Sequence, residues 1–333
     1  MQTTPKISII IPCYNAASYV SPLLEALSRQ AAGKPVEIIV INDGSTDDTL
    51  SILNNYHAQQ PSLFHIVTKE NGGTPPARNL GFSLAKGEYI WYVDGDDLIT
   101  DGAIDALLAH ISHTKADVIC FNYREMDQNG HLLNSLKDWH YTYGSKIDTI
   151  TAYTRFDIPS YLWNRLIRRD YLLSHHITFP GLFPDDEEYV IQTYYAKGSM
   201  QFVPDVIYQY RIVTASHSRK VKTFIIYCDN YKTIIERLIA ESALIDSKPF
   251  CTKLLFNCIK NKLINNNRVR IADPHALPYG RRAVYRTDHD YITRMRSHIT
   301  FRGKYGRLLW VAYRLPWVLD AIVYLRYKLL KWT

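Results

Sequence analysis

The sequence predicts an α/β protein: a doubly wound, mostly parallel sheet with helices on both faces, followed by a basic helical region. Apolar runs rich in β-branched and aromatic residues alternate, along residues 6–123, with segments whose apolar residues recur at helical spacing. Short polar turns follow these runs. In a parallel sheet such turns gather at one edge, beyond the carboxyl ends of the strands, so a ligand site is expected there.

Each element has its own signal. Val20, Leu23 and Leu27 form the apolar stripe of the first helix. The residues from Ser45 to Asp48 have the spacing of a capping box, which predicts the start of a second helix. In chain order, strands are expected at residues 6–12, 36–41, 64–68, 89–93 and 118–123. Helices are expected at residues 18–30, 45–56, 76–85 and about 101–113.

The most informative stretch is YIWYVDGDD at residues 89–97, where a buried strand ends on three carboxylates. The Asp-x-Asp spacing of Asp94 and Asp96 makes an oxygen-rich site for a hard divalent cation, Mn²⁺ or Mg²⁺, which can in turn hold phosphates. Taken alone, the turn is equally compatible with a solvated acidic loop. The chain has no Gly-x-Gly-x-x-Gly after its first strand and no Walker loop, which argues against a dinucleotide enzyme or an ATPase.

Charge divides the chain into two parts. Residues 1–215 contain 16 Lys and Arg against 24 Asp and Glu, whereas residues 216–333 contain 23 against 8. We therefore expect a catalytic domain at 1–215 and a basic, mainly helical region at 216–333. The five cysteines are widely spaced and odd in number, which argues against a disulfide framework or a zinc site. With no signal-peptide pattern before the first strand, these features predict a cytoplasmic protein.

Several segments resemble, in order, the inverting family-2 glycosyltransferases of the GT-A fold, of the type that builds bacterial polysaccharide or lipopolysaccharide. They are SIIIPCYN (8–15), VINDGSTDDT (40–49), NGGTPPARNLGFSLAKGEYIWYVDGDD (71–97), WNRLIRRDYL (163–172) and FPDDEEYV (183–190). Together they span roughly the first 215 residues, which is more specific than any single motif. The resemblance implies a UDP-sugar donor and a divalent cation.

The resemblance also implies roles for individual residues. Tyr14 falls where the family contacts the uracil, Asp43 where a carboxylate accepts from the base, and Arg78 where a guanidinium meets base or phosphate. Asp94 is expected to touch the ribose, and Asp96 to ligate the metal that grips the diphosphate. The full set of expected donor-binding residues is Pro12, Tyr14, Asn15, Asp43, Arg78, Asp94 and Asp96.

The acidic run at residues 185–188 resembles the family's catalytic element, in which Asp186 aligns with the base and Asp185 is the fallback. Direct displacement needs one carboxylate to deprotonate the acceptor hydroxyl. An acidic helix N-terminus stabilised by the helix dipole explains the same run. Four further residues are candidate contacts with the acceptor or the diphosphate, although Trp163 also fits a buried aromatic and His217 an ordinary surface residue: Asp97, Trp163, Arg211 and His217.

Residues 301–333 carry seven Lys and Arg, one acid and interleaved aromatics. Arg314, Pro316, Asp320 and Arg326 interrupt the apolar run, which argues against a membrane-spanning helix. Basic and aromatic residues on amphipathic helices are typical of segments that lie on an anionic membrane. A helical cap on the catalytic domain remains the alternative, and the absence of any recognised nucleic-acid motif argues against nucleic acid as a partner.

These features together predict transfer of one hexose or N-acetylhexosamine from a UDP-sugar to a lipid-linked or lipopolysaccharide-type glycan. We expect the protein at the inner face of the cytoplasmic membrane, in lipopolysaccharide, O-antigen, capsule or exopolysaccharide assembly. The absence of a Gln-x-x-Arg-Trp element favours a single addition over processive synthesis. The alternative is a membrane-associated nucleotide-sugar-binding or adaptor protein without turnover.

Overall fold

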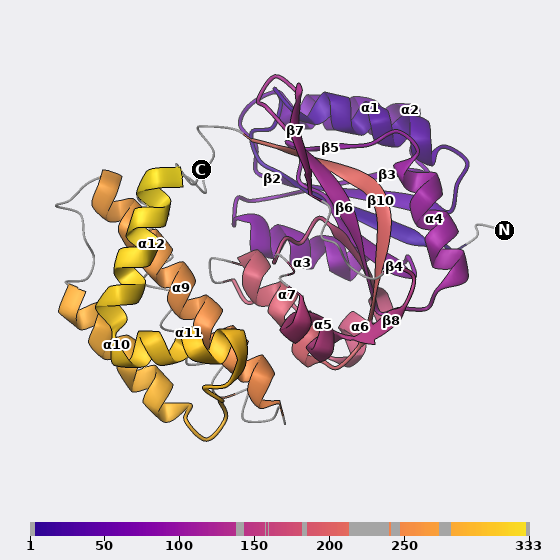
Figure 1. Ribbon diagram of the computed structural model, residues 1–333. Helices are drawn as coiled ribbons and strands as arrows, with labels where there is room; N and C mark the ends of the chain where they lie inside the picture. The colour runs from indigo at the N-terminus through magenta and orange to yellow at the C-terminus, as the bar shows by residue number, and fades with distance from the viewer. Residues whose placement is uncertain are drawn as a thin grey trace. The chain divides into compact units, whose positions relative to one another are not determined.

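The computed structural model describes residues 4–137, 143–156, 158, 160–181, 185–212, 240, 247–272 and 281–330. The chain divides into two compact units (Figure 1). The first comprises Met1–Ala152, Ile158–Gly181 and Asp185–Val213, and it contains the sheet. The second comprises Tyr153–Asp157, Leu182–Pro184 and Thr214–Thr333, and its described part is helical. Each unit is considered by itself below.

A mixed sheet forms the centre of the first unit, with ten strands in the described residues. The strand order is β3-β2-β1-β4-β9-β6-β10-β5, and β7 pairs with β6 while β8 pairs with β10. Pairing is parallel from β3 through β2 and β1 to β4, and again between β6 and β10. The strands are β1 (Ile7–Cys13), β2 (Val36–Asp43), β3 (Phe64–Lys69), β4 (Tyr89–Tyr92), β5 (Leu98–Ile99), β6 (Val118–Met126), β7 (Leu132–Lys137), β8 (Lys146–Asp148), β9 (Arg165–Arg168) and β10 (Ser199–Arg211).

Helices cover both faces of this sheet, which confirms the predicted mostly parallel α/β class (Figure 1). Alternate side chains of β1 point to opposite faces, as a strand requires. Ile9 belongs to the core cluster that includes Leu23 and Leu27 of α1, whereas Ile10 lies against Gly81 of α3. The helices of this unit are α1 (Val20–Ala31), α2 (Thr49–Gln59), α3 (Thr74–Leu84), α4 (Ala103–His113), α5 (Thr149–Arg155, whose last residues belong to the second unit), α6 (Arg169–Ser174) and α7 (Asp185–Tyr195).

The start of α2 differs from the predicted capping box. The helix begins at Thr49, and the Asp48 side chain makes no capping hydrogen bond. Instead, the carboxylate of Asp47 accepts from the backbone N–H of Thr49 at 3.0 Å and from that of Ala17 at 3.1 Å. The predicted helix over residues 45–56 therefore began four residues too early. Asp47 is bound to the turn after β1, a long-range contact that the local spacing does not contain.

The second unit packs its helices around α9 (Lys248–Ala272), with α10 (Arg281–Arg294), α11 (Gly303–Arg314) and α12 (Pro316–Leu330). Both α11 and α12 contact α9, and α10 contacts α11. Two buried polar pairs hold the helices together: Lys262 with Asp288 at 2.6 Å, and Asn267 with Asp320 at 2.9 Å. Among the helices described, none has the length and apolar character that crossing a membrane requires.

Candidate active site

The predicted site residues of the first unit gather at the carboxyl edge of the parallel strands. Asp43 ends β2, the turn at Asp94 follows β4, and Arg211 ends β10. β9 runs antiparallel to β4, so the residues before it lie at the same edge. The indole N–H of Trp91, in β4, donates to the carbonyl of Trp163 at 2.8 Å. This hydrogen bond holds the segment before β9 against β4.

Arg78 of α3 binds both the carboxylate expected at the donor and the two candidate catalytic bases. Its guanidinium, which is buried, donates to Asp94 at 2.8 Å and to Asp185 at 3.0 Å, and it also binds Asp186. Burial acts to lower the pKa of Arg78, but the charges of Asp186, Asp94 and Asp185 outweigh it and raise that pKa. The guanidinium therefore stays charged and holds three carboxylates from distant parts of the sequence in one cluster.

Asp186 is the more accessible of the two candidate bases, with 34% of its side chain exposed against 7% for Asp185. Burial raises the pKa of Asp186 to about 7, Arg78 opposes this rise, and the charges of Asp185 and Asp94 add to it. A carboxyl group with a pKa in this range can accept a proton efficiently near neutral pH. Both carboxylates lie in the first turn of α7, where the helix dipole favours negative charge.

Asp96 is the carboxylate best suited to a cation. Its burial, and then the nearby charge of Asp94, raise its pKa to about 6. A bound cation would lower the pKa of Asp96, because it stabilises the ionised carboxylate. In the described ranges, no three His, Cys, Asp or Glu side chains meet in a way that could hold a metal by themselves. One carboxylate completed by phosphate oxygens and water is a ligand set that Mg²⁺ takes in sites that bind phosphates, so Asp96 fits such a cation.

Asp97 and Arg211, predicted as contacts with the acceptor or the diphosphate, hold the turn in shape. The carboxylate of Asp97 is buried; it accepts from the hydroxyl of Tyr208 at 2.7 Å and from the backbone N–H of Arg211 at 2.7 Å. The guanidinium of Arg211 donates to the carbonyl of Asp96 at 2.6 Å. These contacts tie the end of β10 to the acidic turn, so the two residues position Asp96.

The other predicted donor residues form two linked turns. Asp43 accepts from Lys69 at 2.6 Å and from the backbone N–H groups of Gly72 and Gly73 at 3.0 and 2.8 Å. Asn15, in the turn after β1 with a positive φ of 49°, accepts from the backbone N–H of Thr46 at 2.9 Å. Pro12 is half-buried and Tyr14 is 52% exposed. The exposed ring of Tyr14 is therefore available to a ligand.

Trp163 is buried, at 4% exposed, between other aromatic rings. This favours the buried-aromatic interpretation of Trp163 over direct stacking on a sugar. His217 lies outside the described residues. Lys69, the partner of Asp43, and Tyr208, the partner of Asp97, were not predicted as site residues. Tyr208 had a signal in the two-residue spacing from Tyr210, which places both rings on one face of a strand.

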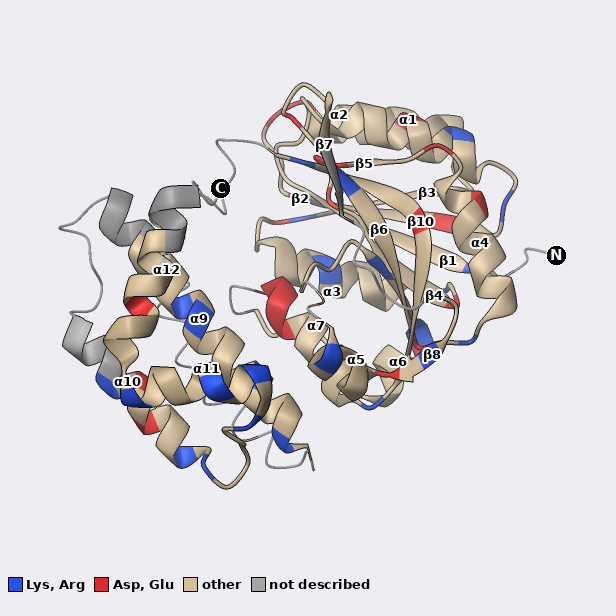
Figure 2. Cartoon of the chain, in the orientation of Figure 1, with Lys and Arg blue, Asp and Glu red and all other residues tan. Residues whose placement is uncertain are grey.

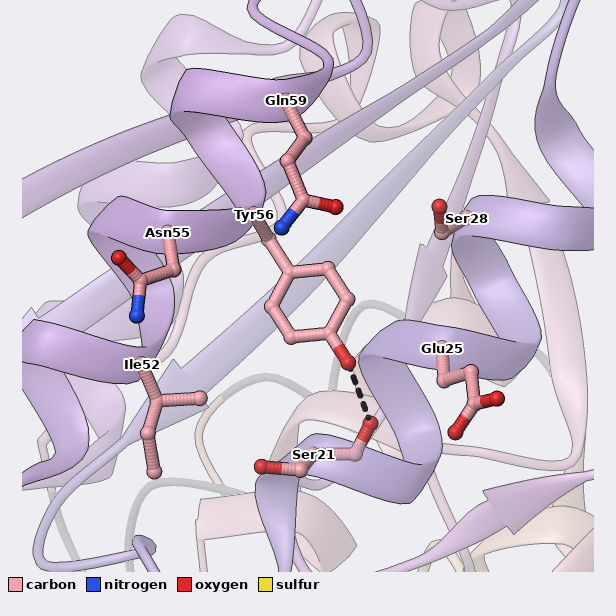
Figure 3. A pocket seen from close by; sticks show the side chains of 7 residues that line it. All are labelled: Ser21, Glu25, Ser28, Ile52, Asn55, Tyr56 and Gln59. Carbon is pink, nitrogen blue, oxygen red and sulfur yellow. Dashed lines mark hydrogen bonds between the residues drawn. The ribbon is translucent and has the colours of Figure 1, made fainter.

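A separate depression lies between α1 and α2 (Figure 3). Tyr56 crosses it, and its hydroxyl donates to the carbonyl of Ser21 at 3.3 Å. Glu25 is its single charged residue, so it lacks the converging carboxylates of the carboxyl edge. Its lining residues are Ser21, Glu25, Ser28, Ile52, Asn55, Tyr56 and Gln59. We therefore place the active site at the carboxyl edge.

Comparison with known proteins identifies the family of the domain that carries most of these residues. The family model described as glycosyl transferase family 2 matches residues 8–173. These residues form a family 2 glycosyltransferase domain. The family 2 domain contains Asp43, Arg78 and the acidic turn, whereas α7 with Asp186 follows it.

EpsH of Bacillus subtilis is 30% identical over 217 residues, which are 64% of this chain and 62% of EpsH. A cholesterol galactosyltransferase of Borreliella burgdorferi is 27% identical over 213 residues, 61% of this chain and 59% of that protein. The chain thus spans less than two thirds of the length of these relatives. The crystal structure of S. aureus TarS 1–349 in complex with UDP-GlcNAc has the same fold, with a TM-score of 0.68, 20% identity, and coverage of 97% of this chain and 92% of TarS 1–349.

Proposed function

We propose that this protein is an inverting, metal-dependent glycosyltransferase that adds one hexose or N-acetylhexosamine from a UDP-sugar to a hydroxyl group of a glycan. One observation carries the proposal: Arg78 brings Asp94 and the candidate base Asp186 together, beside Asp96. A carboxylate for the donor, a general base and a cation site together can serve direct displacement at an anomeric carbon.

The donor would lie along the carboxyl edge. The exposed ring of Tyr14 suits the flat face of a uracil. The N–H of the base would bind Oδ2 of the buried Asp43, an atom that also accepts from the backbone N–H of Gly73, while Oδ1 accepts from Lys69 and Gly72. Asp94 suits the ribose hydroxyls, since one of its oxygens is already fixed by Arg78. That TarS was crystallised with UDP-GlcNAc supports a UDP-sugar as the first donor to test.

The transfer itself needs few groups. Asp186 takes the proton of the acceptor hydroxyl, whose oxygen then attacks the anomeric carbon while the bond to the UDP oxygen breaks. Since attack and departure occur on opposite faces of the sugar, the product has the inverted configuration. A divalent cation held by Asp96, Mn²⁺ or Mg²⁺, would neutralise the charge that develops on the leaving diphosphate. Asp97 and Arg211 keep the turn that presents Asp96 in place.

We further propose that the acceptor is lipid-linked and that the second unit docks on an anionic membrane at its inner, cytoplasmic face. Lys and Arg are spread over α9, α10 and α11 (Figure 2). In α11 the exposed Trp310 lies between the exposed Arg307 and Arg314, three and four residues away on the same helix face. α12 adds Trp317, which is 62% exposed, and Ile322. Such a surface fits lipid headgroups with the rings at the interface.

Lipid-linked glycans are the acceptors of polysaccharide and lipopolysaccharide assembly, and we place the protein in such a pathway. The Borreliella relative is named a cholesterol galactosyltransferase, and cholesterol is a lipid. This supports an acceptor held at a membrane rather than a free sugar.

Calorimetric binding of UDP, with and without Mn²⁺, tests the donor site. We expect the wild type to bind UDP in the presence of Mn²⁺, and Asp96→Ala to lose at least tenfold in affinity, because it removes the main cation ligand. Asp101→Ala is the matched control, since Asp101 is a fully solvated carboxylate in a surface ion pair with Arg29.

Three outcomes separate the alternatives. Metal-dependent UDP binding with hydrolysis or transfer of UDP-GlcNAc supports the enzyme. Binding without turnover, for UDP-GlcNAc, UDP-glucose and UDP-galactose with lipid acceptors, supports a nucleotide-sugar-binding protein. If UDP does not bind under any metal condition, the UDP-sugar proposal is wrong, and the same titration with GDP then tests a different donor nucleotide.

A further inference from the structure

Four aromatic rings lie nearly parallel at the carboxyl edge of the sheet. Trp163 stacks on Tyr208, with centroids 4.6 Å apart and planes 9° apart, and on Tyr210 at 5.2 Å and 11°. It also stacks on Tyr161 at 4.8 Å and 10°. Tyr208 and Tyr210 lie two residues apart in β10, which puts their rings on one face of that strand. Tyr161 and Trp163 lie in the turn that precedes β9.

The stack is buried at one end and exposed at the other. Tyr208 and Trp163 are 0% and 4% exposed, whereas Tyr161 is 42% exposed. The ring of Tyr161 is held from behind by Trp163 and at its edge by Tyr123, whose plane is at 89° with centroids 5.8 Å apart. An exposed ring whose orientation is already fixed can bind a ligand with little further loss of entropy.

This stack is joined directly to the candidate active site. The hydroxyl of Tyr208 donates to the carboxylate of Asp97 and accepts from the backbone N–H of Asp94 at 3.1 Å. Tyr161 is thus separated by two stacked rings from the acidic turn that presents Asp96. Tyr161 precedes β9, at the same edge of the sheet as the acidic turn.

We propose that Tyr161 is a binding platform for the acceptor, on which one hexopyranose unit of the glycan stacks. The inference rests on the proposed function and gives it an acceptor subsite. A pyranose ring has one face made of C–H groups and a rim of hydroxyl groups. A flat, half-exposed phenol offers an apolar face together with a polar rim, and therefore matches a sugar better than a purely apolar ligand.

Saturation-transfer NMR with chitotriose, cellotriose, maltotriose and mannotriose, each in the presence of UDP and Mn²⁺, tests the platform. We expect at least one trisaccharide to bind the wild type, with the strongest transfer to the protons of its C–H face. Tyr161→Phe should bind within about twofold of wild type, because it keeps the ring. Tyr161→Ala should bind about tenfold more weakly, since aromatic stacking is worth on the order of 1 kcal/mol.

Tyr14→Ala is the crossed control, because Tyr14 is the other exposed tyrosine of this edge. It should weaken UDP binding and leave the trisaccharide in place, whereas Tyr161→Ala should do the reverse. Tyr161→Leu keeps apolar bulk without a flat ring, and it replaces the alanine variant if the latter does not fold.

Two results overturn the platform. One is a wild type that binds UDP with Mn²⁺ but none of the four trisaccharides, which leaves the proposed function intact. The other is a trisaccharide that binds Tyr161→Ala or Tyr161→Leu as tightly as wild type. Failure of the wild type to bind UDP at all is a failure of the proposed donor site, and it is thereby distinguished from both.

Discussion

At the scale of single residues, the environment of each carboxylate suggests its task. Asp97 has both oxygens engaged with β10, so it supports the turn. Asp185 is almost fully buried against Arg78. Asp186 contacts the same guanidinium yet remains a third exposed. A base must be accessible to the acceptor hydroxyl whose proton it takes, and the greater exposure of Asp186 favours it over Asp185.

The pKa of Asp186 predicts a pH dependence. Because burial raises this pKa to about 7, and only the ionised carboxylate accepts a proton, the transfer rate should fall about tenfold per pH unit below pH 7 and level off above it. Asp186→Asn should lower kcat by at least about 10²-fold. Rates with UDP-GlcNAc or the active UDP-sugar, measured from pH 5 to 9, check both.

Glu187→Gln is the control for that substitution, because it removes one charge from the same turn of α7. If Asp186→Asn keeps wild-type kcat while Asp185→Asn loses it, Asp185 is the base instead.

At the scale of elements, the approach of α3 to the sheet depends on one glycine. A Cβ on Gly81 would lie 2.4 Å from Cγ2 of Ile10 and 3.5 Å from Cγ1 of Ile41. α3 carries Arg78, so this close packing also sets the position of the guanidinium. α3 therefore packs directly on β1 and β2, whose carboxyl ends form part of the site.

Gly81→Ala should therefore destabilise the protein by about 1–3 kcal/mol, because it overpacks a rigid interface. Thermal or urea unfolding measures the effect. Ser83→Ala, on the exposed side of the same helix, should change the free energy of unfolding by less than about 0.5 kcal/mol. Equal unfolding midpoints for Gly81→Ala and wild type would show that α3 can move away from Ile10 without cost.

The predicted strands and helices of the first 123 residues were found because their signals are local. Apolar periodicity identifies a strand or a helix without knowledge of its partner. The antiparallel direction of β9 could not be derived in this way, since it depends on pairing with β4 and β6. For the same reason Arg78 was predicted to meet the donor but not Asp185 and Asp186, which are 107 and 108 residues away.

Exposure was the other quantity that local sequence did not provide. Trp163 was a candidate contact with the acceptor because it is a large aromatic residue in a motif, but the stack buries it. Tyr161, two residues earlier, is the exposed ring. Which member of an aromatic pair faces solvent is decided by the strand that packs on it, here β10 with Tyr208 and Tyr210.

At the scale of the whole molecule, the two units have different surfaces. The second unit combines exposed basic residues with exposed Trp310, Trp317 and Ile322. Its inner side is apolar, with Leu309 and Leu319 buried, so these outer rings are not needed for its core. Exposed rings and aliphatic side chains beside basic residues are typical of helices that lie on a lipid surface.

We expect the protein to sediment with vesicles that contain phosphatidylglycerol and much less with pure phosphatidylcholine, because anionic lipid attracts the basic residues. Trp317→Ala combined with Ile322→Ala should reduce the bound fraction at least fivefold, and high salt should reduce it further. Leu173→Ala, which removes an exposed apolar side chain from the first unit, is the control. Equal sedimentation with both lipids, or of the double variant and the wild type, would contradict docking through this surface.

Because Asp94 and Asp186 share the guanidinium of Arg78, donor binding is coupled to the protonation of Asp186. On the proposed assignment, Asp94 belongs to the donor and Asp186 to the acceptor, yet both charges are balanced by one cation. A ligand that changes the charge around Asp94 must alter the proton affinity of Asp186, and by thermodynamic reciprocity the protonation of Asp186 must alter donor affinity. Donor binding and proton binding are then a single linked equilibrium, so donor affinity should change with pH over the range in which Asp186 titrates.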